Sequence, residues 1–325
     1  MKEVFTDRNT LVKNVNGKER LEMNWTEKYR PKRIADIRGQ NKFVADATSW
    51  IEKKNMPNVL IYGNPGNGKT TAGHCLANEF LGNGKQNNFI EINASQDRKL
   101  DTIRTTITNF ANTKGSDDVP FKICLLDEID GMTRDSQRAL KRTMERAINV
   151  RFVITCNEHS DVDYAIRSRC ANYWFEPLPY GDMYKCLWYI SIEEGFKVND
   201  DDLLEYSKSI NGDMRRGINE LQACAFSGGD LSTVTKDFKN DYYNILGHLA
   251  DGEVFKANDL LLKEILSGRS VKEICSNLHQ CVLEKDLERS TMFKCLSHIG
   301  EMEWRSKSMT PKIVVSWFVA QFIDN

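Results

Sequence analysis

The sequence has little that would point to a secreted, membrane-spanning or zinc-stabilised protein. Its nine cysteines include no Cys-x-x-Cys pair, and no cysteine and histidine cluster has zinc-ligand spacing. Buried reduced thiols fit better than disulfides, because disulfide scaffolds are much shorter than 325 residues. Residues 1–23 are too charged for a signal-peptide core, and the longest apolar stretch, residues 313–322, is too short to span a bilayer. We therefore expect an intracellular protein with no membrane partner.

An excess of charge of one sign is also missing. The 45 Lys and Arg residues nearly balance the 46 Asp and Glu residues, which gives a formal net charge of −1. This excludes a globally basic nucleic-acid coat, but not a local basic face, because an electrostatic field depends on where the charges sit. The length of 325 residues favours about two or three domains.

Short apolar runs alternate with helical segments in the first half of the chain. The runs are residues 59–62, 89–92, 122–126 and 151–155. Buried strands that alternate with helices predict a parallel sheet covered on both faces. Beyond Pro179 the pattern is helical only, and Gly228-Gly229 interrupts it. We therefore expect a loose polar arm followed by an α/β domain, a small helical domain and an all-α domain, over residues 1–23, 24–178, 179–230 and 231–325.

A phosphate-binding loop follows the first apolar run. The stretch from Gly63 to Thr70 is a full Walker A match, Gly-x-x-x-x-Gly-Lys-Thr, between a strand and a helix. Its glycines let backbone N–H groups turn toward phosphate oxygens, and the helix N-terminus adds partial positive charge. Lys69 is expected to reach the β- and γ-phosphates, and Thr70 to bind Mg²⁺. The predicted loop contacts are Gly63, Asn64, Pro65, Gly66, Asn67, Gly68, Lys69, Thr70 and Thr71.

Carboxylates end a later strand, in the sequence Leu-Leu-Asp127-Glu128. Asp127 is expected to hold Mg²⁺, mostly through water, and Glu128 to polarise the attacking water as a general base. A solvated acidic turn is the alternative, which the Walker A loop makes weaker. Asn157, after another strand, is placed to orient the water or contact the γ-phosphate, although Asn also commonly ends strands for turn reasons. The sequence thus predicts a P-loop NTPase.

Five further motifs stand in order along the chain: Trp25-Thr-Glu-Lys-Tyr-Arg-Pro31, Asn93-Ala-Ser95, Leu126-Asp-Glu128, Ser168-Arg-Cys170 and Gly212-Asp-Met-Arg-Arg216. Together they resemble the small subunits of replication factor C, the sliding-clamp loader, within the AAA+ ATPases. The resemblance runs from about residue 25 to 225, whereas residues 231–325 match only in length and helical character. It implies ATP as the nucleotide, an AAA+ domain with a helical lid, and a helical collar for oligomerisation. Departures from the family pattern, such as Gln96 after Asn-Ala-Ser, indicate a divergent or viral member.

The resemblance also implies roles for particular residues. The implied base and ribose contacts are Tyr29, Arg30 and Pro31. Asn157 falls at the sensor 1 position and Arg215 at sensor 2, which reaches the γ-phosphate from the lid. Arg169 falls at the arginine finger, which acts on ATP bound by the neighbouring subunit. A solvated charge or a structural ion pair is the alternative for Arg169.

A basic helix is expected over residues 134–151, with an apolar stripe formed by Leu140, Met144, Ala147 and Ile148. Such a basic face more often means only a solvated helix. The resemblance implies instead that this helix and the preceding one follow the phosphate backbone of primer–template DNA, which gives affinity without sequence readout. The implied contacts are Arg98, Arg104, Arg134, Arg138 and Arg142.

The helix expected over residues 100–111 carries apolar residues at a spacing that usually means core packing. The resemblance places the end of this helix against the sliding clamp. It makes Ile107 and Phe110 the candidate clamp contacts, while plain core packing stays equally open.

The resemblance implies an ATPase subunit of a five-membered ring that includes other clamp-loader subunits, among them a large one. ATP binding would open the clamp and grip primed DNA, and hydrolysis would release the loaded clamp. A non-hydrolytic AAA+ adaptor is one alternative, which the presence of both Lys69 and Glu128 disfavours. A related AAA+ helicase or helicase loader is another, which the Ser-Arg-Cys motif and the compact length disfavour. The compartment stays open between the cytoplasm, for a prokaryote or its virus, and the nucleus.

Overall fold

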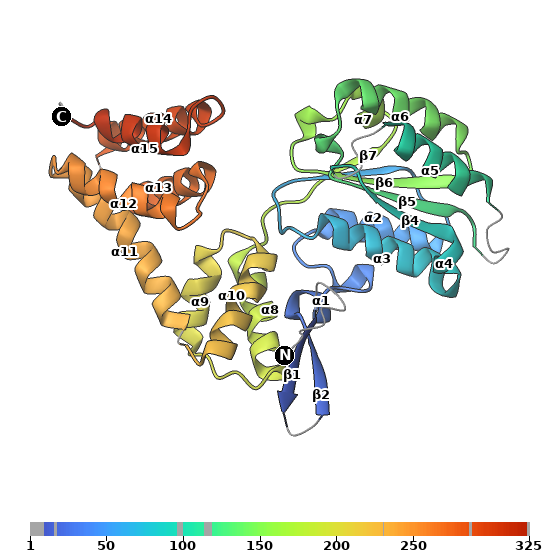
Figure 1. Cartoon of the computed structure of the whole chain (residues 1–325), viewed down its shortest axis with the longest axis horizontal. Coiled ribbons are helices and arrows are strands. Elements are labelled where there is room, and N and C mark those ends of the chain that lie inside the picture. Colours follow the sequence, from blue (N-terminus) through green and yellow to red (C-terminus); the bar gives the residue numbers. More distant parts are fainter. Residues whose placement is uncertain are drawn as a thin grey trace. The chain divides into compact units, whose positions relative to one another are not determined.

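The computed structural model describes residues 10–15, 18–95, 100–113, 119–229, 231–285 and 288–323. The chain divides into two compact units, residues 1–229 and 230–325. The first unit contains a parallel sheet, the helices that cover it and three further helices, and the described part of the second unit is helical throughout (Figure 1).

Five parallel strands form the sheet, in the order β4-β5-β6-β3-β7. They are β3 Val59–Tyr62, β4 Phe89–Asn93, β5 Lys122–Asp127, β6 Val150–Cys156 and β7 Ala171–Trp174. The first four coincide with the predicted apolar runs. The fifth was not predicted, because β7 lies at the sheet edge and has a single buried residue, Tyr173, which leaves it without an apolar run.

Helices cover both faces of the sheet, as expected for an α/β domain (Figure 1). Successive side chains of β3 alternate between two cores: Leu60 packs with α5 and α6, and Ile61 packs with α2 and α3. The helices of this α/β domain are α2 Asn41–Glu52, α3 Lys69–Leu81, α4 Lys85–Asn88, α5 Leu100–Asn112, α6 Arg134–Arg146 and α7 Tyr164–Arg167. The predicted parallel sheet covered on both faces is therefore confirmed.

The apolar stripe of α6 is shorter than predicted. Leu140, Met144 and Ala147 are buried, but Ile148 is 84% exposed. The helix ends at Arg146, and Ala147 leaves the helical conformation with ψ 63°. Beyond that point the helical period no longer decides which side faces the core, so the prediction for Ile148 is wrong.

A buried lysine holds the end of α5 against the sheet. Lys122, at the start of β5, is only 3% exposed, and its Nζ donates to the carbonyl of Phe110 at 2.6 Å and to the Thr113 hydroxyl at 2.9 Å. Helix C-termini carry carbonyls without intrahelical partners, so an ammonium there satisfies them. Ile107 is fully buried in the same region and offers no surface to a partner, while Phe110 is half-buried. The burial of Ile107 favours core packing over a clamp contact.

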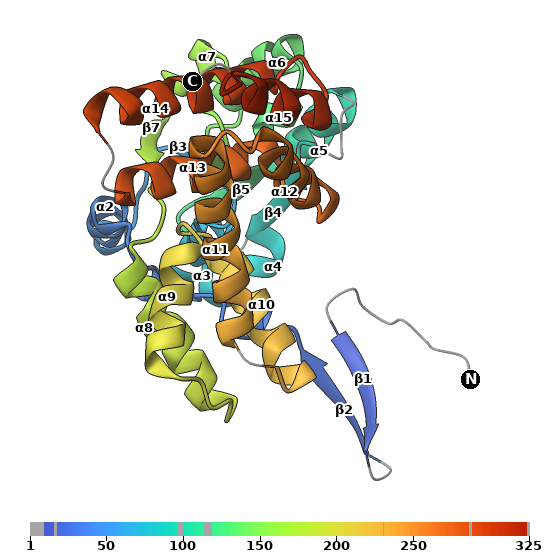
Figure 2. The same cartoon turned by 90° about the vertical axis from the view of Figure 1, so that its left-hand side faces the viewer.

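Residues 10–23, expected to be a loose arm, contain an antiparallel hairpin, seen in Figures 1 and 2. Its strands are β1 Thr10–Val15 and β2 Lys18–Met23. The sequence between them is Asn-Gly, a strong short-range hairpin signal that the polar composition of the segment obscures.

Three helices after the sheet form the predicted helical segment, which is called the lid below: α8 Tyr180–Glu193, α9 Asp200–Ser209 and α10 Met214–Ser227. The short helix α1, Trp25–Lys28, docks on α10. The Trp25 backbone N–H donates to Gln222 Oε1 at 3.1 Å, and the Trp25 ring meets Phe226 edge-on at 5.9 Å. The segment before the sheet is thus tied to the helices after it.

The second unit contains α11 Leu231–Ala250, α12 Val254–Leu266, α13 Val271–Glu284, α14 Arg289–Arg305 and α15 Pro311–Ala320. These helices share one apolar core. Glu264 is buried within it and accepts a hydrogen bond from Tyr242 Oη at 2.6 Å. Among the described residues, no helix is both long and apolar enough to cross a membrane.

Truncation of a side chain to alanine should affect stability differently at the two ends of the predicted apolar stripe of α6. Leu140→Ala should lower the free energy of unfolding by about 2–5 kcal/mol, because it opens a cavity in the core. Ile148→Ala should change it by less than about 0.5 kcal/mol, because the side chain is exposed. Urea unfolding of the full chain measures both. Equal reductions would contradict the described end of α6.

Candidate nucleotide-binding site

The loop between β3 and α3 is shaped by glycines that no other residue could replace without strain. Gly63 has φ 142°, and a Cβ there would lie 2.3 Å from the Phe175 carbonyl oxygen. Gly66 has φ 82°, and its Cβ would lie 1.9 Å from Asp213 Oδ1, at the start of α10. The loop therefore packs tightly against Phe175, which follows β7, and against Asp213 at the start of α10, and its glycines supply the positive φ that a phosphate-binding turn needs.

Lys69 begins α3, and its ammonium lies within the loop. Nζ donates to the carbonyls of Gly63 at 2.7 Å and Asn64 at 2.9 Å, and to Asn157 Oδ1 at 3.1 Å. Burial lowers the pKa of Lys69, and the nearby Asp127 carboxylate opposes this shift. The contact with Asn157 joins the predicted phosphate-binding lysine to the predicted sensor 1 residue.

Two threonines meet one carboxylate at the sheet edge. Asp127 Oδ1 accepts from Thr70 Oγ1 at 2.9 Å and from Thr155 Oγ1 at 2.5 Å. Among the described residues, no group of three or more His, Cys, Asp or Glu side chains is arranged to hold a metal. Mg²⁺ usually takes only one or two protein oxygens and fills its shell with phosphates and water. The predicted pair, Thr70 and Asp127, fits that donor set.

Glu128, the residue after Asp127, has an unusual backbone conformation. It adopts a left-handed conformation with φ 56°, which is uncommon outside glycine and typical of functional sites. Its Oε2 accepts from Ser95 Oγ at 2.8 Å, and its N–H donates to Thr155 Oγ1 at 3.1 Å. Nearby, Asp130 Oδ2 accepts from the Asn157 N–H at 3.0 Å.

Three of these residues, Ser95, Thr155 and Asp130, were not among the predicted site residues. Ser95 follows β4, and Thr155 lies at the end of β6, so both reach the edge where Asp127 ends β5. A sequence signal existed in the placement of polar residues at the carboxyl ends of neighbouring parallel strands.

A cavity of about 500 Å³ lies beside the loop, between the α1 segment and the lid. Its walls include the three predicted base and ribose contacts, Tyr29, Arg30 and Pro31. Tyr29 Oη donates to Glu194 Oε1 at 2.8 Å, and its ring meets Tyr189 edge-on. Burial, and then the bond to Glu194, raises the pKa of Tyr29 to about 12. The cavity thus offers an aromatic wall whose hydroxyl is already bonded.

A second, smaller cavity of about 100 Å³ lies at the phosphate end, against Lys69, Asp127, Glu128 and Asn157. The two cavities share four residues: Gly66, Gly68, Thr71 and Arg215. Arg215, in the first turn of α10, brings a guanidinium from the lid to both. The two cavities together have the layout of a nucleotide site, with a base end and a phosphate end. Of the predicted loop contacts, Gly63 and Asn64 contribute carbonyls to Lys69 instead, and Asn67 bonds the Phe175 carbonyl at 2.9 Å.

Arg169 is not among the described residues that line the two cavities. It follows α7, where Nη1 donates to the Ala165 carbonyl at 2.7 Å and Nε donates to Glu145 Oε1 at 3.1 Å. About a third of the side chain is exposed. The guanidinium is thus partly accessible and separate from the set of groups that face this chain's own nucleotide cavity.

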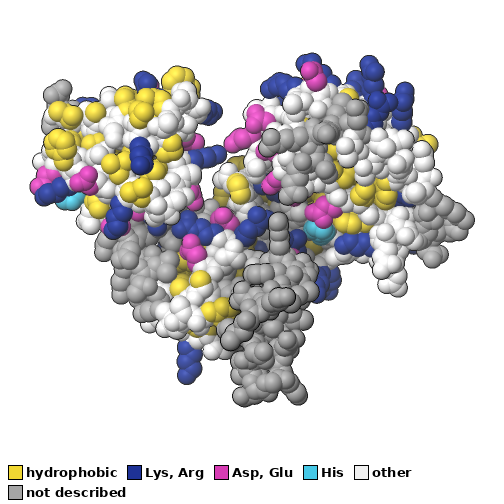
Figure 3. Space-filling view, in the orientation of Figure 1, with side chains coloured by type: hydrophobic (Ala, Val, Ile, Leu, Met, Phe, Trp, Pro, Cys, Tyr) yellow, Lys and Arg dark blue, Asp and Glu magenta, His cyan; other side chains and the backbone are white. Residues whose placement is uncertain are grey.

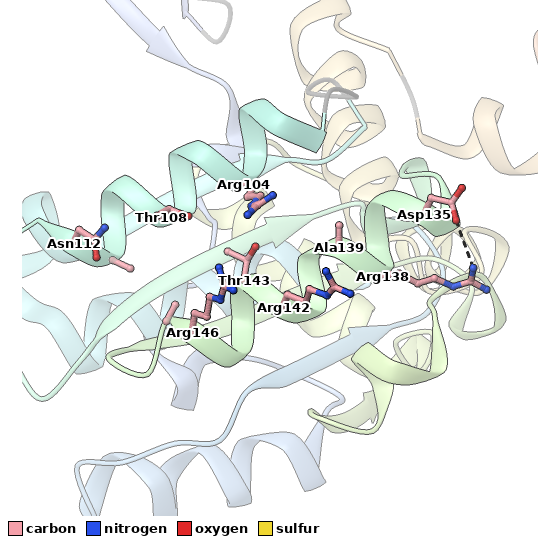
Figure 4. Close-up of a pocket in the computed structure, with 11 residues that line it drawn as sticks. Arg104, Thr108, Asn112, Asp135, Arg138, Ala139, Arg142, Thr143 and Arg146 are labelled. Atoms are coloured by element: carbon pink, nitrogen blue, oxygen red, sulfur yellow. Dashed lines mark hydrogen bonds and ion pairs between the residues drawn. The ribbon is translucent and has the colours of Figure 1, made fainter.

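A basic groove of about 440 Å³ runs between α5 and α6. Figure 4 shows its side chains, and Figure 3 shows Lys and Arg gathered over this part of the first unit. The arginines that line it are Arg104, Arg138, Arg142 and Arg146. Arg134, also predicted, begins α6, and Arg98 lies outside the described residues.

Comparisons with known proteins identify the family of the chain. The family model described as "ATPase family associated with various cellular activities (AAA)" matches residues 59–178. The replication factor C small subunit of Methanocella arvoryzae is 35% identical over 310 residues, which covers 92% of this chain and 95% of the relative. That of Methanothermobacter thermautotrophicus is 34% identical over 314 residues, which covers 93% and 98%. The chain belongs to the replication factor C small-subunit family.

The match to replication factor C small subunits extends further than the sequence motifs did. Its 310 aligned residues exceed the 229 of the first unit, so the second unit is included. The Thermotoga maritima RuvB Holliday junction branch migration motor has TM-score 0.55 at 17% identity, over 68% of this chain and 79% of that one. Likeness at this identity shows a shared fold alone.

Glu128→Gln should separate ATP binding from hydrolysis. The amide keeps the shape of the side chain but cannot accept a proton from water, so kcat should fall by about 10²–10⁴. Affinity for ATP should change by less than about twofold, because Lys69 and the loop are untouched. Steady-state hydrolysis and nucleotide titration give the two values. Unchanged kcat would show that Glu128 is not the base.

Proposed function

We propose that the chain is the ATPase subunit of a sliding-clamp loader of the replication factor C type. ATP binding would drive clamp opening and grip of primer–template DNA, and hydrolysis would release the loaded clamp. The observation that carries this proposal is the split of the catalytic groups. One set converges on this chain's own nucleotide cavity, while Arg169 belongs to a different surface.

The residues of the cavity divide the chemistry of ATP hydrolysis among them. Lys69 and Arg215 neutralise phosphate charge, and the loop N–H groups cradle the phosphates. Asn157 orients the attacking water beside the γ-phosphate, and Glu128 accepts its proton. Thr70 and Asp127 would hold Mg²⁺, which supplies charge neutralisation when bound.

Arg169 acts on the nucleotide of a neighbouring subunit in this proposal. Its present ion pair with Glu145 is partly exposed, and such a pair is worth only about 0–1 kcal/mol. An arginine delivered to a γ-phosphate is worth about 10³–10⁵ in rate in other NTPases. If Arg169 leaves Glu145 to bind a phosphate, the stability lost is therefore small compared with the gain in the rate of hydrolysis.

The α5–α6 groove is the proposed DNA surface. Four arginines line a concave surface whose only carboxylate among the described lining residues, Asp135, lies 3.5 Å from Arg138. Guanidinium groups arranged this way suit phosphates, and they do not select a base sequence. That suits a protein that must accept any primed site. For the clamp, Phe110 stays the proposed contact on α5.

The proposal extends to the assembly and its location. A shared catalytic site requires at least one neighbouring subunit, and the family implies a five-membered ring with a large subunit. A protein that acts on replicating DNA works inside the cell, in the cytoplasm or the nucleus according to its host.

Steady-state ATP hydrolysis tests the proposal. The chain alone should hydrolyse ATP slowly, because a lone subunit lacks an arginine from a neighbour. Addition of primed DNA, a cognate clamp and the partner subunits should raise the rate by at least about 10-fold. Bound ATP that is never hydrolysed under these conditions would favour the non-hydrolytic adaptor instead.

The groove makes a separate prediction about DNA. Arg104→Ala with Arg142→Ala should weaken binding to all primed duplexes about equally. The slope of log affinity against log salt should fall by about 1 for each phosphate that the double variant no longer neutralises. Lys42→Ala, an exposed residue of α2 on the opposite face of the sheet, is the matched control and should leave the slope unchanged. An unchanged slope in the double variant would remove the groove from the DNA surface.

A further inference from the structure

A histidine outside the nucleotide cavity links two parts of the catalytic machinery. His159 opens the short 3-10 helix His159–Asp161, two residues after Asn157. Its ring packs on that of Tyr62 with centroids 4.4 Å apart. One ring nitrogen lies 3.2 Å from Arg167 Nη1, and the other lies 3.2 Å from Asn172 Oδ1.

The partners of His159 determine the role of each ring nitrogen. A guanidinium can only donate, so His159 Nδ1 must accept from Arg167. The hydrogen therefore sits on Nε2, where it faces the Asn172 carbonyl oxygen. The orientation of the Asn172 amide is fixed as well, because its Nδ2 faces two carbonyl oxygens, which can only accept.

Those two carbonyls bracket the arginine finger position. Asn172 Nδ2 donates to the carbonyl of Arg167 at 3.0 Å and to that of Cys170 at 2.7 Å. The turn that carries Arg169 is therefore held at both ends by one side chain, and His159 holds that side chain in turn. Arg167, on the same turn, is held by the other ring nitrogen.

On its other side, His159 contacts Tyr62, the residue that precedes the phosphate loop. Tyr62 ends β3, immediately before Gly63 of the phosphate loop. The Gly63 N–H donates to the Asn157 carbonyl at 3.3 Å, so the loop and the sensor 1 residue are also joined by backbone. A shift of Asn157 or of the loop would thus be transmitted to the ring of His159 and to the turn beyond it.

We propose that His159 is a positioning residue that couples the nucleotide state of this subunit to the placement of Arg169 in the site of its neighbour. This inference rests on the proposed function, in which Arg169 acts in trans. His159 contacts no group that would react. It fixes where the Arg169 turn sits relative to Asn157, and a displacement of about 1 Å at a catalytic group can cost about 10²-fold in rate.

A double-mutant cycle tests this coupling. His159→Phe keeps the ring that packs on Tyr62 and removes both nitrogens. In the full assembly with primed DNA and clamp, it should lower kcat by about 10–100-fold and leave ATP affinity within about twofold. In an Arg169→Ala background, the same substitution should lower kcat by less than about twofold further, because the residue through which it acts is gone.

Asn172→Ala removes the side chain that holds the Arg169 turn, so it should lower kcat in the same way as His159→Phe. It replaces His159→Phe in the cycle if that variant folds poorly. His74→Phe is the matched control, since this histidine belongs to α3, and its ring lies tilted against that of Phe89, beside Glu91. It should leave kcat within about twofold. Thermal unfolding of each variant confirms that the chain is folded.

The outcomes separate the two proposals. An undiminished kcat in Arg169→Ala alone would overturn the trans role of the arginine, and with it the proposed function. Suppose instead that Arg169→Ala lowers kcat strongly. Then an unchanged kcat in His159→Phe, or an equal loss of kcat from His159→Phe in the wild-type and Arg169→Ala backgrounds, would overturn the coupling alone. Weaker ATP binding in His159→Phe would assign the residue to its own nucleotide site instead.

Discussion

The hydrogen bonds to the carboxylate of Asp127 are the contacts on which the catalytic site depends. One oxygen accepts from Thr70 on α3 and from Thr155 on β6, while the residue itself ends β5. Three elements are therefore fixed at one point. Glu128 and Asn157 directly follow β5 and β6, and they bond to Thr155 and Lys69 beside this point. The parallel register and the two buried faces of the sheet hold this edge in place.

The same edge bears on the proposal that hydrolysis is shared between subunits. The groups proposed to bind phosphate and activate water come from the phosphate loop and the start of α3, the ends of β5 and β6, and α10, all within one chain. Arg169, the proposed catalytic arginine, is not part of this set. It follows α7 and is held there by a weak ion pair. In the proposed function, such a subunit binds ATP by itself but needs the arginine of a neighbour for rapid hydrolysis. Under that proposal, assembly would be a condition for turnover.

Most of the sheet and the phosphate loop could be predicted, because both are encoded locally. Strands buried on two faces are continuous apolar runs, and the loop chemistry requires glycines and a lysine at fixed spacing. The edge strand β7 has one buried residue, so no run marked it. Ile148 was misplaced because periodicity does not show where a helix ends.

Several contacts between residues far apart in sequence could not be predicted. Ser95 meets Glu128 from a different strand, and the pairing depends on sheet order. His159 and Asn172 are each ordinary polar residues in sequence, and only the fold places them around the Arg169 turn. The roles given to Arg169 and Arg215 came from resemblance to a family and not from spacing. The geometry adds that Arg215 faces the nucleotide cavity and that Arg169 belongs to another surface.

Subunit complementation tests the shared site most directly. A Lys69→Ala chain lacks the phosphate-binding lysine but keeps Arg169. An Arg169→Ala chain lacks the arginine but keeps Lys69. Each variant assembled alone should show almost no ATP hydrolysis. Assemblies purified to contain both chains should regain a clear fraction of the wild-type rate, because the intact nucleotide site of one chain meets the arginine of the other. No gain of activity in such mixed assemblies would contradict the account.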